Sequence, residues 1–343
     1  MKMTMIILLK RSFGLLLLLT IFTGTLQAQD PVFSQFYSSP LSVNPALAGN
    51  GSADWRLIIN RRSQWFASGV EPFNTTSVSF DGKLFKQKDK ETNYIGGGLM
   101  FMQDYGMSGA YKNNSFHGIL SSHVAIDEND YHGLSIGLAA TYSNLIIDYT
   151  QLSFSSQLAS SGFNRALPTN EAYLSTVKPY VSMAAGITYT YTDESSNFDV
   201  GVAGYRFMKT RRSALNDSTQ LDPPHYNFHA DYQAFLSDRL AFNANAVYIV
   251  QNSQNFYSLG VNLGHILDDS ETPTVFNTGL WYRSNDAVIP YLGLMYRNLQ
   301  LGLTYDVTLS SSKNSLGSMK TFEFSLILRS PQKVAHAIPC PWK

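Results

Sequence analysis

The chain has 343 residues, with 25 basic and 25 acidic side chains and a formal net charge of zero, so it offers no basic face of the kind that binds nucleic acid. A single cysteine excludes both an internal disulfide and cysteine-rich zinc motifs. Charged residues make up only 15% and aromatic residues 13%, which suits strands with aromatic girdles in a membrane better than a water-facing enzyme.

The N-terminus has the pattern of an export signal. Lys2, Lys10 and Arg11 are positive, and an apolar run over 13–22 follows them. This run is too short for a membrane span, and no cysteine follows it to carry a lipid anchor. We predict a signal peptide over residues 1–28, cleaved near Ala28.

Residues 29–51 are predicted to be an irregular segment, because aromatic side chains alternate there with turn-forming residues. Prolines at 40 and 45 let such a segment hold a fixed path without helix or strand bonds. It is either a plug that tucks into a barrel and contacts partners, or an ordered lead-in to the first strand. The candidate contact residues are Phe33, Phe36, Tyr37, Asn44 and Pro45.

Residues 52–330 repeat short stretches in which apolar and polar residues alternate. From Leu299 to Asp306 every odd residue is apolar or aromatic and every even one is small or polar. A strand with this pattern has one apolar and one polar face. The predicted strands are 53–62, 73–84, 93–104, 112–125, 131–146, 179–192, 197–208, 224–237, 239–251, 254–267, 273–284, 287–297, 299–310 and 318–330.

This series predicts an all-β fold, a transmembrane antiparallel β-barrel of about 14 strands, since single-chain barrels have an even number of strands. A soluble β-sandwich alternates in the same way, but the export signal and the strand count favour the barrel. Residues 331–343 would form a C-terminal periplasmic tail, in which Cys340 is either unreactive or pairs with a partner.

The lengths of the connections predict the orientation of the barrel. Barrels of the outer membrane have short periplasmic turns and longer outside loops. The two longest connections, 147–178 and 209–223, both follow an odd strand, so we expect strand one to run outward and these loops to lie outside. The short turns on the other side are 127–130, 193–196, 237–238 and 297–298. Phe154 and Phe163 make the first long loop apolar enough to contact a partner.

Arg61, Arg62, Gln64 and Trp65 lie at or just after the end of the first predicted strand. At an outer rim, Arg62 could bind a carboxylate or a lipopolysaccharide phosphate, with Trp65 beside it. A girdle tryptophan with arginines that reach the lipid headgroups explains the same residues. Both interpretations stay open.

The sequence contains no recognisable catalytic or metal motif. Seven histidines are scattered without metal-ligand spacing, and neither a Gly-x-Ser-x-Gly motif nor a phosphate-binding glycine loop occurs. His229 and Asp231 share one predicted strand face, which is either a dyad or ordinary polarity of a lumen lining. We predict no catalytic residues, no cofactor, no metal site and therefore no enzyme.

Several motifs resemble those of the PorP/SprF family, membrane proteins of the type IX secretion system. The most specific are Gln29–Tyr37, Pro40-Leu41 and Asn44–Gly49 at the start of the mature chain. The Arg-x-x-Gln-Trp element at 61–65, the strand at 75–81 and the Cys340-Pro341 pair are also similar. The final Trp342-Lys343 differs from the Arg-Phe that is usual in the family.

The resemblance implies a barrel in the outer membrane of a Gram-negative bacterium. Its partners would be outer-membrane lipid, type IX secretion components and a large exported surface protein such as a gliding adhesin, and for some members a peptidoglycan-binding lipoprotein. We expect a non-enzymatic component that docks or anchors an exported protein and links it to periplasmic machinery. The alternatives are a transporter for a hydrophobic small molecule with residues 31–49 as a gating plug, an outer-membrane enzyme, and a soluble all-β adhesin.

Overall fold

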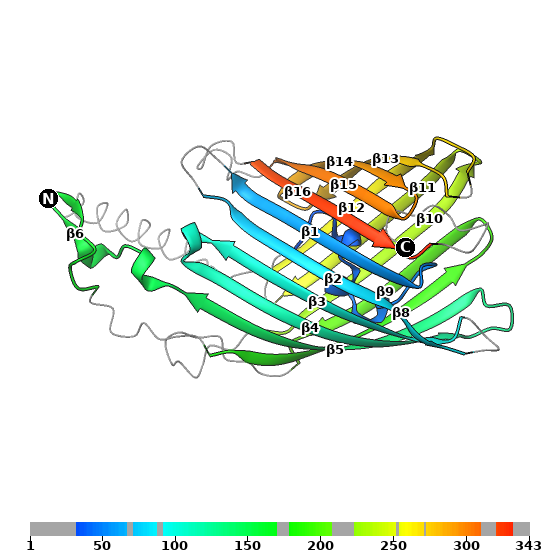
Figure 1. Ribbon diagram of the computed structural model, residues 1–343, viewed down its shortest axis with the longest axis horizontal. Coiled ribbons are helices and arrows are strands. Elements are labelled where there is room, and N and C mark those ends of the chain that lie inside the picture. The colour runs from blue at the N-terminus through cyan, green and yellow to red at the C-terminus, as the bar shows by residue number, and fades with distance from the viewer. Residues whose placement is uncertain are drawn as a thin grey trace, which may run out of the picture. The chain divides into compact units, whose positions relative to one another are not determined.

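The computed structural model describes residues 32–66, 71–87, 92–169, 178–207, 223–251, 254–270, 272–309 and 320–331, all within one compact unit of the chain. Fourteen strands of this part form a single closed antiparallel barrel (Figure 1). The predicted signal peptide, Cys340, most of the loop at 209–223 and nearly all of the tail lie outside the described residues.

The barrel strands follow one another in chain order, and β16 pairs with β1 to close the sheet. Their bounds are β1 (Trp55–Phe66), β2 (Phe73–Lys86), β3 (Tyr94–Gly106), β4 (Tyr111–Ala125), β5 (His132–Ile147), β8 (Tyr180–Thr192), β9 (Ser196–Tyr205), β10 (His225–Ser237), β11 (Leu240–Gln251), β12 (Gln254–Ile266), β13 (Val275–Arg283), β14 (Ala287–Tyr296), β15 (Leu299–Thr308) and β16 (Lys320–Arg329). The predicted barrel of fourteen strands is confirmed, and the sandwich is wrong because one sheet closes on itself.

We call the end of the barrel that carries the connections 148–179 and 206–224 the loop end, and the opposite end the turn end. The first connection holds a two-stranded hairpin of β6 (Leu158–Ala159) and β7 (Gly162–Phe163), together with two 3-10 turns, η4 (Tyr149–Gln151) and η5 (Ser155–Gln157). Another 3-10 turn, η3 (Met107–Gly109), links β3 to β4.

The strands reverse the usual distribution of polarity. On β15, Leu299, Leu301 and Leu303 are 37–52% exposed on the outside. The alternate residues Gln300, Thr304 and Asp306 face inward and are at most 2% exposed. An apolar outer surface around a polar interior is the arrangement that lipid requires of a barrel. Among the helices that the structure describes, none is long and apolar enough to cross a membrane.

Short polar turns close the turn end. In the turn between β8 and β9, the Asp193 carboxylate accepts hydrogen bonds from the backbone N–H groups of Ser195, at 2.8 Å, and Ser196, at 2.7 Å. The hydrogen bond from the Ser195 backbone, with those from Ser196, lowers the pKa of Asp193 to about 2. Aspartate stabilises such a turn because its side chain replaces a missing backbone partner.

Residues 32–50 lie inside the barrel, and we call them the luminal segment (dark blue in Figure 1). The segment has only short turns of helix: η1 (Phe36–Ser38), α2 (Pro40–Val43) and η2 (Pro45–Leu47). Pro40 and Pro45 each occupy the first position of their turn, where a missing N–H costs nothing. Two apolar clusters fix it: Tyr37 packs among Trp281 and Tyr291, and Leu41 packs near Met100.

Candidate functional site

The first described residues of the luminal segment are held by two acidic side chains of the wall. The backbone N–H groups of Ser34 and Gln35 donate to the Glu323 carboxylate of β16, at 2.6 and 2.8 Å. The Ser34 hydroxyl donates to Asp306 of β15 at 2.8 Å. Because both carboxylates are fully or almost fully buried, these bonds are made without competition from water.

Asp306 also joins two arginines of other strands. Arg283, the last residue of β13, lies 2.5 Å from its carboxylate, and Arg62 of β1 lies 3.2 Å from it. Arg62 donates in addition to the carbonyl of Val32. The start of the segment therefore completes a buried ionic network that links β1, β13, β15 and β16 near the loop end.

The position of Arg62 corrects one expectation. Strand β1 continues to Phe66, four residues further than predicted, so Arg62 faces the lumen and is buried instead of lying at an exposed rim. Its neighbour Arg61 points outward, since consecutive strand residues face opposite sides. Trp65 lies near the end of the strand, is 53% exposed and has a positive φ of 60°.

Asn44 fixes the middle of the segment on the opposite wall. Its side-chain oxygen accepts from the Ala46 N–H at 2.9 Å, and its amide nitrogen donates to the Thr188 hydroxyl at 3.1 Å. The same nitrogen lies 3.1 Å from Nε2 of His229. This side chain thus caps η2 and attaches it to β8 and β10.

Glycines in the wall make room for this contact. A Cβ on Gly186 of β8 would lie 1.9 Å from Oδ1 of Asn44, and one on Gly137 of β5 would lie 2.2 Å from the backbone nitrogen of Ala46. Atoms cannot approach so closely, and in both cases the neighbour is firmly held. Glycine at these two positions is therefore required by the close approach of the segment.

The last part of the segment is tied to the turn end. The Gly49 N–H donates to Asp81 of β2 at 2.7 Å, and Arg56 of β1 lies 2.6 Å from the same carboxylate. Arg56 also donates to the carbonyl of Leu47 at 3.1 Å. The carbonyl of Ala48 accepts from the Ser121 hydroxyl of β4 at 2.7 Å. The segment thus runs the length of the lumen, with a buried ion pair at each end.

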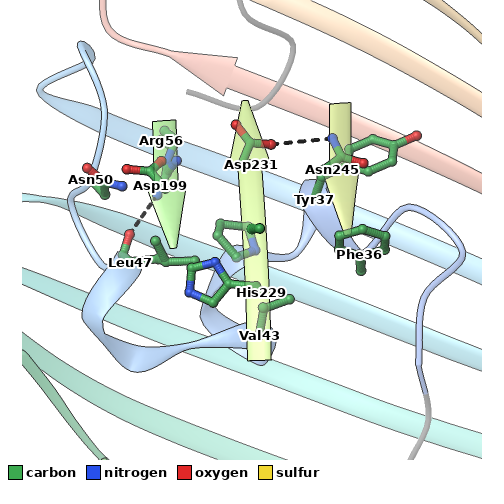
Figure 2. Close-up of a pocket in the computed structure, with 12 residues that line it drawn as sticks. Phe36, Tyr37, Val43, Leu47, Asn50, Arg56, Asp199, His229, Asp231 and Asn245 are labelled. Carbon is green, nitrogen blue, oxygen red and sulfur yellow. Dashed lines mark hydrogen bonds between the residues drawn. The ribbon is translucent and has the colours of Figure 1, made fainter. Parts of the chain in front are cut away.

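A cavity that is partly open to solvent lies beside the luminal segment (Figure 2). The segment supplies its apolar side, with Phe36, Pro40, Val43 and Leu47. The wall supplies its polar side, with Arg56, Asp199, His229, Asp231 and Asn245. The cavity is therefore apolar on one side and polar on the other.

His229 and Asp231 both line this cavity, as their shared strand face predicted. Nε2 of His229 lies 3.1 Å from the amide nitrogen of Asn44 and 3.4 Å from the Thr188 hydroxyl. The Asp231 carboxylate accepts hydrogen bonds from Gln233 at 2.7 Å and from Asn245 at 3.4 Å. Both side chains therefore take part in the polar lining of the lumen. In the described part of the chain, no three His, Cys, Asp or Glu side chains are placed to hold a metal ion.

The predicted contact residues fall into two groups. The lumen brings together Phe33, Phe36, Tyr37, Asn44, Pro45 and Arg62, all of them buried. Trp65, Phe154 and Phe163 do not join them. Phe154 is half-buried in the first long loop, and Phe163 of β7 is 60% exposed opposite Leu158 of β6.

The sequence analysis missed the charged residues that hold the segment. They are Arg56, Asp81, Arg283, Asp306 and Glu323. Their positions in the sequence could have indicated them. Each lies on the polar face of a predicted strand, where a charged side chain of a membrane barrel faces the lumen and pairs with another polar group. The pattern shows the direction of these side chains but not their partners.

Comparison with known proteins gives a family match over nearly the whole chain. The family described as "Type IX secretion system membrane protein PorP/SprF" matches residues 25–328. No curated protein matches the chain.

Solved structures of similar architecture are barrels of low sequence identity. The toluene transporter TbuX of Ralstonia pickettii is 11% identical with a TM-score of 0.46, covering 85% of this chain and 93% of its own. A FadL homologue of Pseudomonas aeruginosa is 10% identical with a TM-score of 0.49, covering 83% and 92%. The monoaromatic hydrocarbon channel CymD is 8% identical with a TM-score of 0.48, covering 86% and 93%. Similarity at this level says nothing about what the chain binds.

Proposed function

Because this chain belongs to the PorP/SprF family of type IX secretion system membrane proteins, we propose that it is a non-enzymatic outer-membrane barrel that docks or anchors an exported surface protein. The observation that carries the proposal is the luminal segment, which is hydrogen-bonded to strands on opposite sides of the lumen. A lumen occupied in this way favours a docking component over a wide conduit for protein.

The loop end supplies the contact surface for the exported protein. Leu158 and Phe163 face each other across the β6–β7 hairpin, and both are 60% exposed. A pair of large apolar side chains at the tip of a loop gains free energy when a partner covers it. We take the orientation that the lengths of the connections predict, in which the first strand runs outward and the loop end lies outside the cell.

The turn end then faces the periplasm. Its short polar turns, including 193–195 and 238–239, form a surface for periplasmic components of the secretion system, among them a peptidoglycan-binding lipoprotein. Export requires a signal peptide, and cleavage near Ala28 leaves the luminal segment close to the start of the mature chain.

The hairpin gives a direct test. Replacing Leu158 and Phe163 with serine should strongly reduce surface display of one exported protein, because the apolar contact is lost. The amount of barrel in the outer membrane should not change, since neither residue belongs to the barrel. Ile126→Ser, at a turn-end residue that is 61% exposed, is the matched control. Normal display in the double variant would reject the hairpin as the docking surface.

The cavity favours a second candidate, a transporter for a hydrophobic small molecule. Phe36, Val43 and Leu47 would hold the apolar body of such a molecule, and movement of the luminal segment would open its path. Val43→Trp fills the cavity and should abolish uptake of an apolar compound, whereas display of the exported protein should persist. Equal uptake by this variant and the unaltered chain would exclude the candidate.

A further inference from the structure

A row of polar side chains crosses the outer, lipid-facing side of five neighbouring strands near the loop end. The strands β1 to β5 lie side by side in Figure 1. The row consists of one outward residue from each strand, and each is the direct cross-strand partner of the next: Arg61, Thr76, Gln103, Asn114 and Asn144.

The next row toward the loop end is also hydrophilic over four strands. It consists of Ser63, Asn74, Tyr105 and Lys112, and it ends at Ile146 of β5. The row on the other side is wholly apolar or aromatic: Ile59, Val78, Phe101, Phe116 and Tyr142. The outer face of the barrel therefore changes from apolar to polar within one step of about 7 Å along each strand.

The polar side chains of the two rows form hydrogen bonds along the surface. Gln103 donates to Asn114 at 2.8 Å, and the Ser63 hydroxyl donates to Asn74 at 2.6 Å. Arg61 donates to the same Asn74 oxygen at a long 3.4 Å. These contacts hold the amides in place, and each amide group keeps further hydrogen-bonding capacity.

The charged side chains of the two polar rows are all positive. Arg61 and Lys112 are the ionisable cations of this patch, and neither row contains an aspartate or glutamate. Lys112 lies over the Tyr105 ring, 5.8 Å from its centroid, so its ammonium group is positioned at the surface. Of the nearby carboxylates, Asp104 points into the lumen and is buried, whereas Asp148, just after the end of β5, lies within electrostatic reach of Lys112.

The position of the polar rows on the barrel and the chemistry of their side chains indicate which ligand they bind. Polar side chains facing hydrocarbon would be costly, so the apolar row marks the edge of the membrane core and the polar rows lie at headgroup level. Amides suit sugar hydroxyls, and two cations suit phosphates. Large apolar anchors, which dominate protein–protein contacts, are nearly absent from the two rows.

We infer that this patch binds the phosphorylated sugar headgroup of the glycolipid in the outer leaflet. Arg61 and Lys112 bind phosphate, Gln103 and Asn114 bind sugar hydroxyls, and the aromatic row below packs against the acyl chains. The inference rests on the proposed function for one point, the outward orientation of the loop end.

The test measures lipid A bound to the purified full chain by native mass spectrometry. Arg61→Gln with Lys112→Gln should bind lipid A at least about tenfold more weakly, because the loss of one charge-assisted contact alone has an effect of this scale. Dephosphorylated lipid A should bind the unaltered chain with a similar deficit. Arg239→Gln with Lys86→Gln removes two cations at the turn end and should bind like the unaltered chain.

Separate outcomes distinguish this inference from the proposed function. Heat-modifiable migration and recovery in the outer membrane show whether each variant forms the barrel. If barrel and surface display are intact but lipid A binds all variants equally, the glycolipid site alone is wrong. Retention of phospholipid in place of lipid A would also overturn it, because the patch would then face the inner leaflet. Loss of a protein partner with lipid A binding unchanged would assign the patch to protein docking and overturn it as well.

Discussion

The carboxylate of Asp306 is shared by hydrogen-bond donors from three other residues. It accepts from Arg62, Arg283 and the Ser34 hydroxyl, and it is 2% exposed. In the sequence Asp306 is one of many polar residues at alternate strand positions. Nothing local indicates that it meets a residue 272 positions earlier, which is why only its inward direction could be predicted.

Replacement of Asp306 by asparagine should destabilise the barrel. The change removes the negative charge between two buried guanidinium groups, which costs about 3 kcal/mol in the free energy of unfolding. Urea unfolding in lipid vesicles, followed by tryptophan fluorescence, measures it. Asp286→Asn is the matched control, because Asp286 also pairs with Arg283 but is 47% exposed, and its loss should cost at most about 1 kcal/mol. Equal losses would show that the buried network adds nothing.

A methyl group on Gly137 should push the luminal segment away from β5. Overpacking of this kind costs about 1–3 kcal/mol, and the segment should become accessible to added protease. Gly118→Ala is the matched control on β4, because its Cβ would meet nothing within 4 Å. If the segment in Gly137→Ala is as resistant to protease as in Gly118→Ala, the close contact is not a determinant of its position.

At the scale of elements, strands and luminal segment differ in how far the sequence determines them. Period-two alternation located all fourteen barrel strands, because lipid outside and polar groups inside act on every residue. The main error concerned the end of β1, where two consecutive arginines suggested a rim although they face opposite sides of a continuing strand. The path of the segment depends on partners such as Glu323, 288 residues from Gln35, and no local pattern encodes them.

Removal of residues 33–49 tests the segment as an element. The strand ladder does not include these residues, so the barrel should still assemble and show heat-modifiable migration. The lumen should then conduct ions, and single-channel conductance in planar bilayers should rise well above that of the intact chain. Unchanged conductance in a correctly assembled deletion variant would mean that the segment does not restrict passage through the lumen.

At the scale of the whole molecule, a barrel with an apolar exterior encloses the luminal segment and carries an exposed apolar hairpin in a connection of its loop end. Family membership places the chain in the type IX secretion system, and we propose the two ends of the barrel as the surfaces for its protein partners. The sequence predicted this architecture because it is repeated along the chain. Which partner binds could not be predicted, since that depends on a surface outside this chain.

We propose that the barrel holds a specific exported protein at the cell surface. A clean deletion of the gene, followed by quantitative mass spectrometry of proteins accessible at the cell surface, tests this role. We predict the loss of one large exported protein from the surface and its return when the intact gene is restored. A surface proteome unchanged by the deletion would contradict the claim.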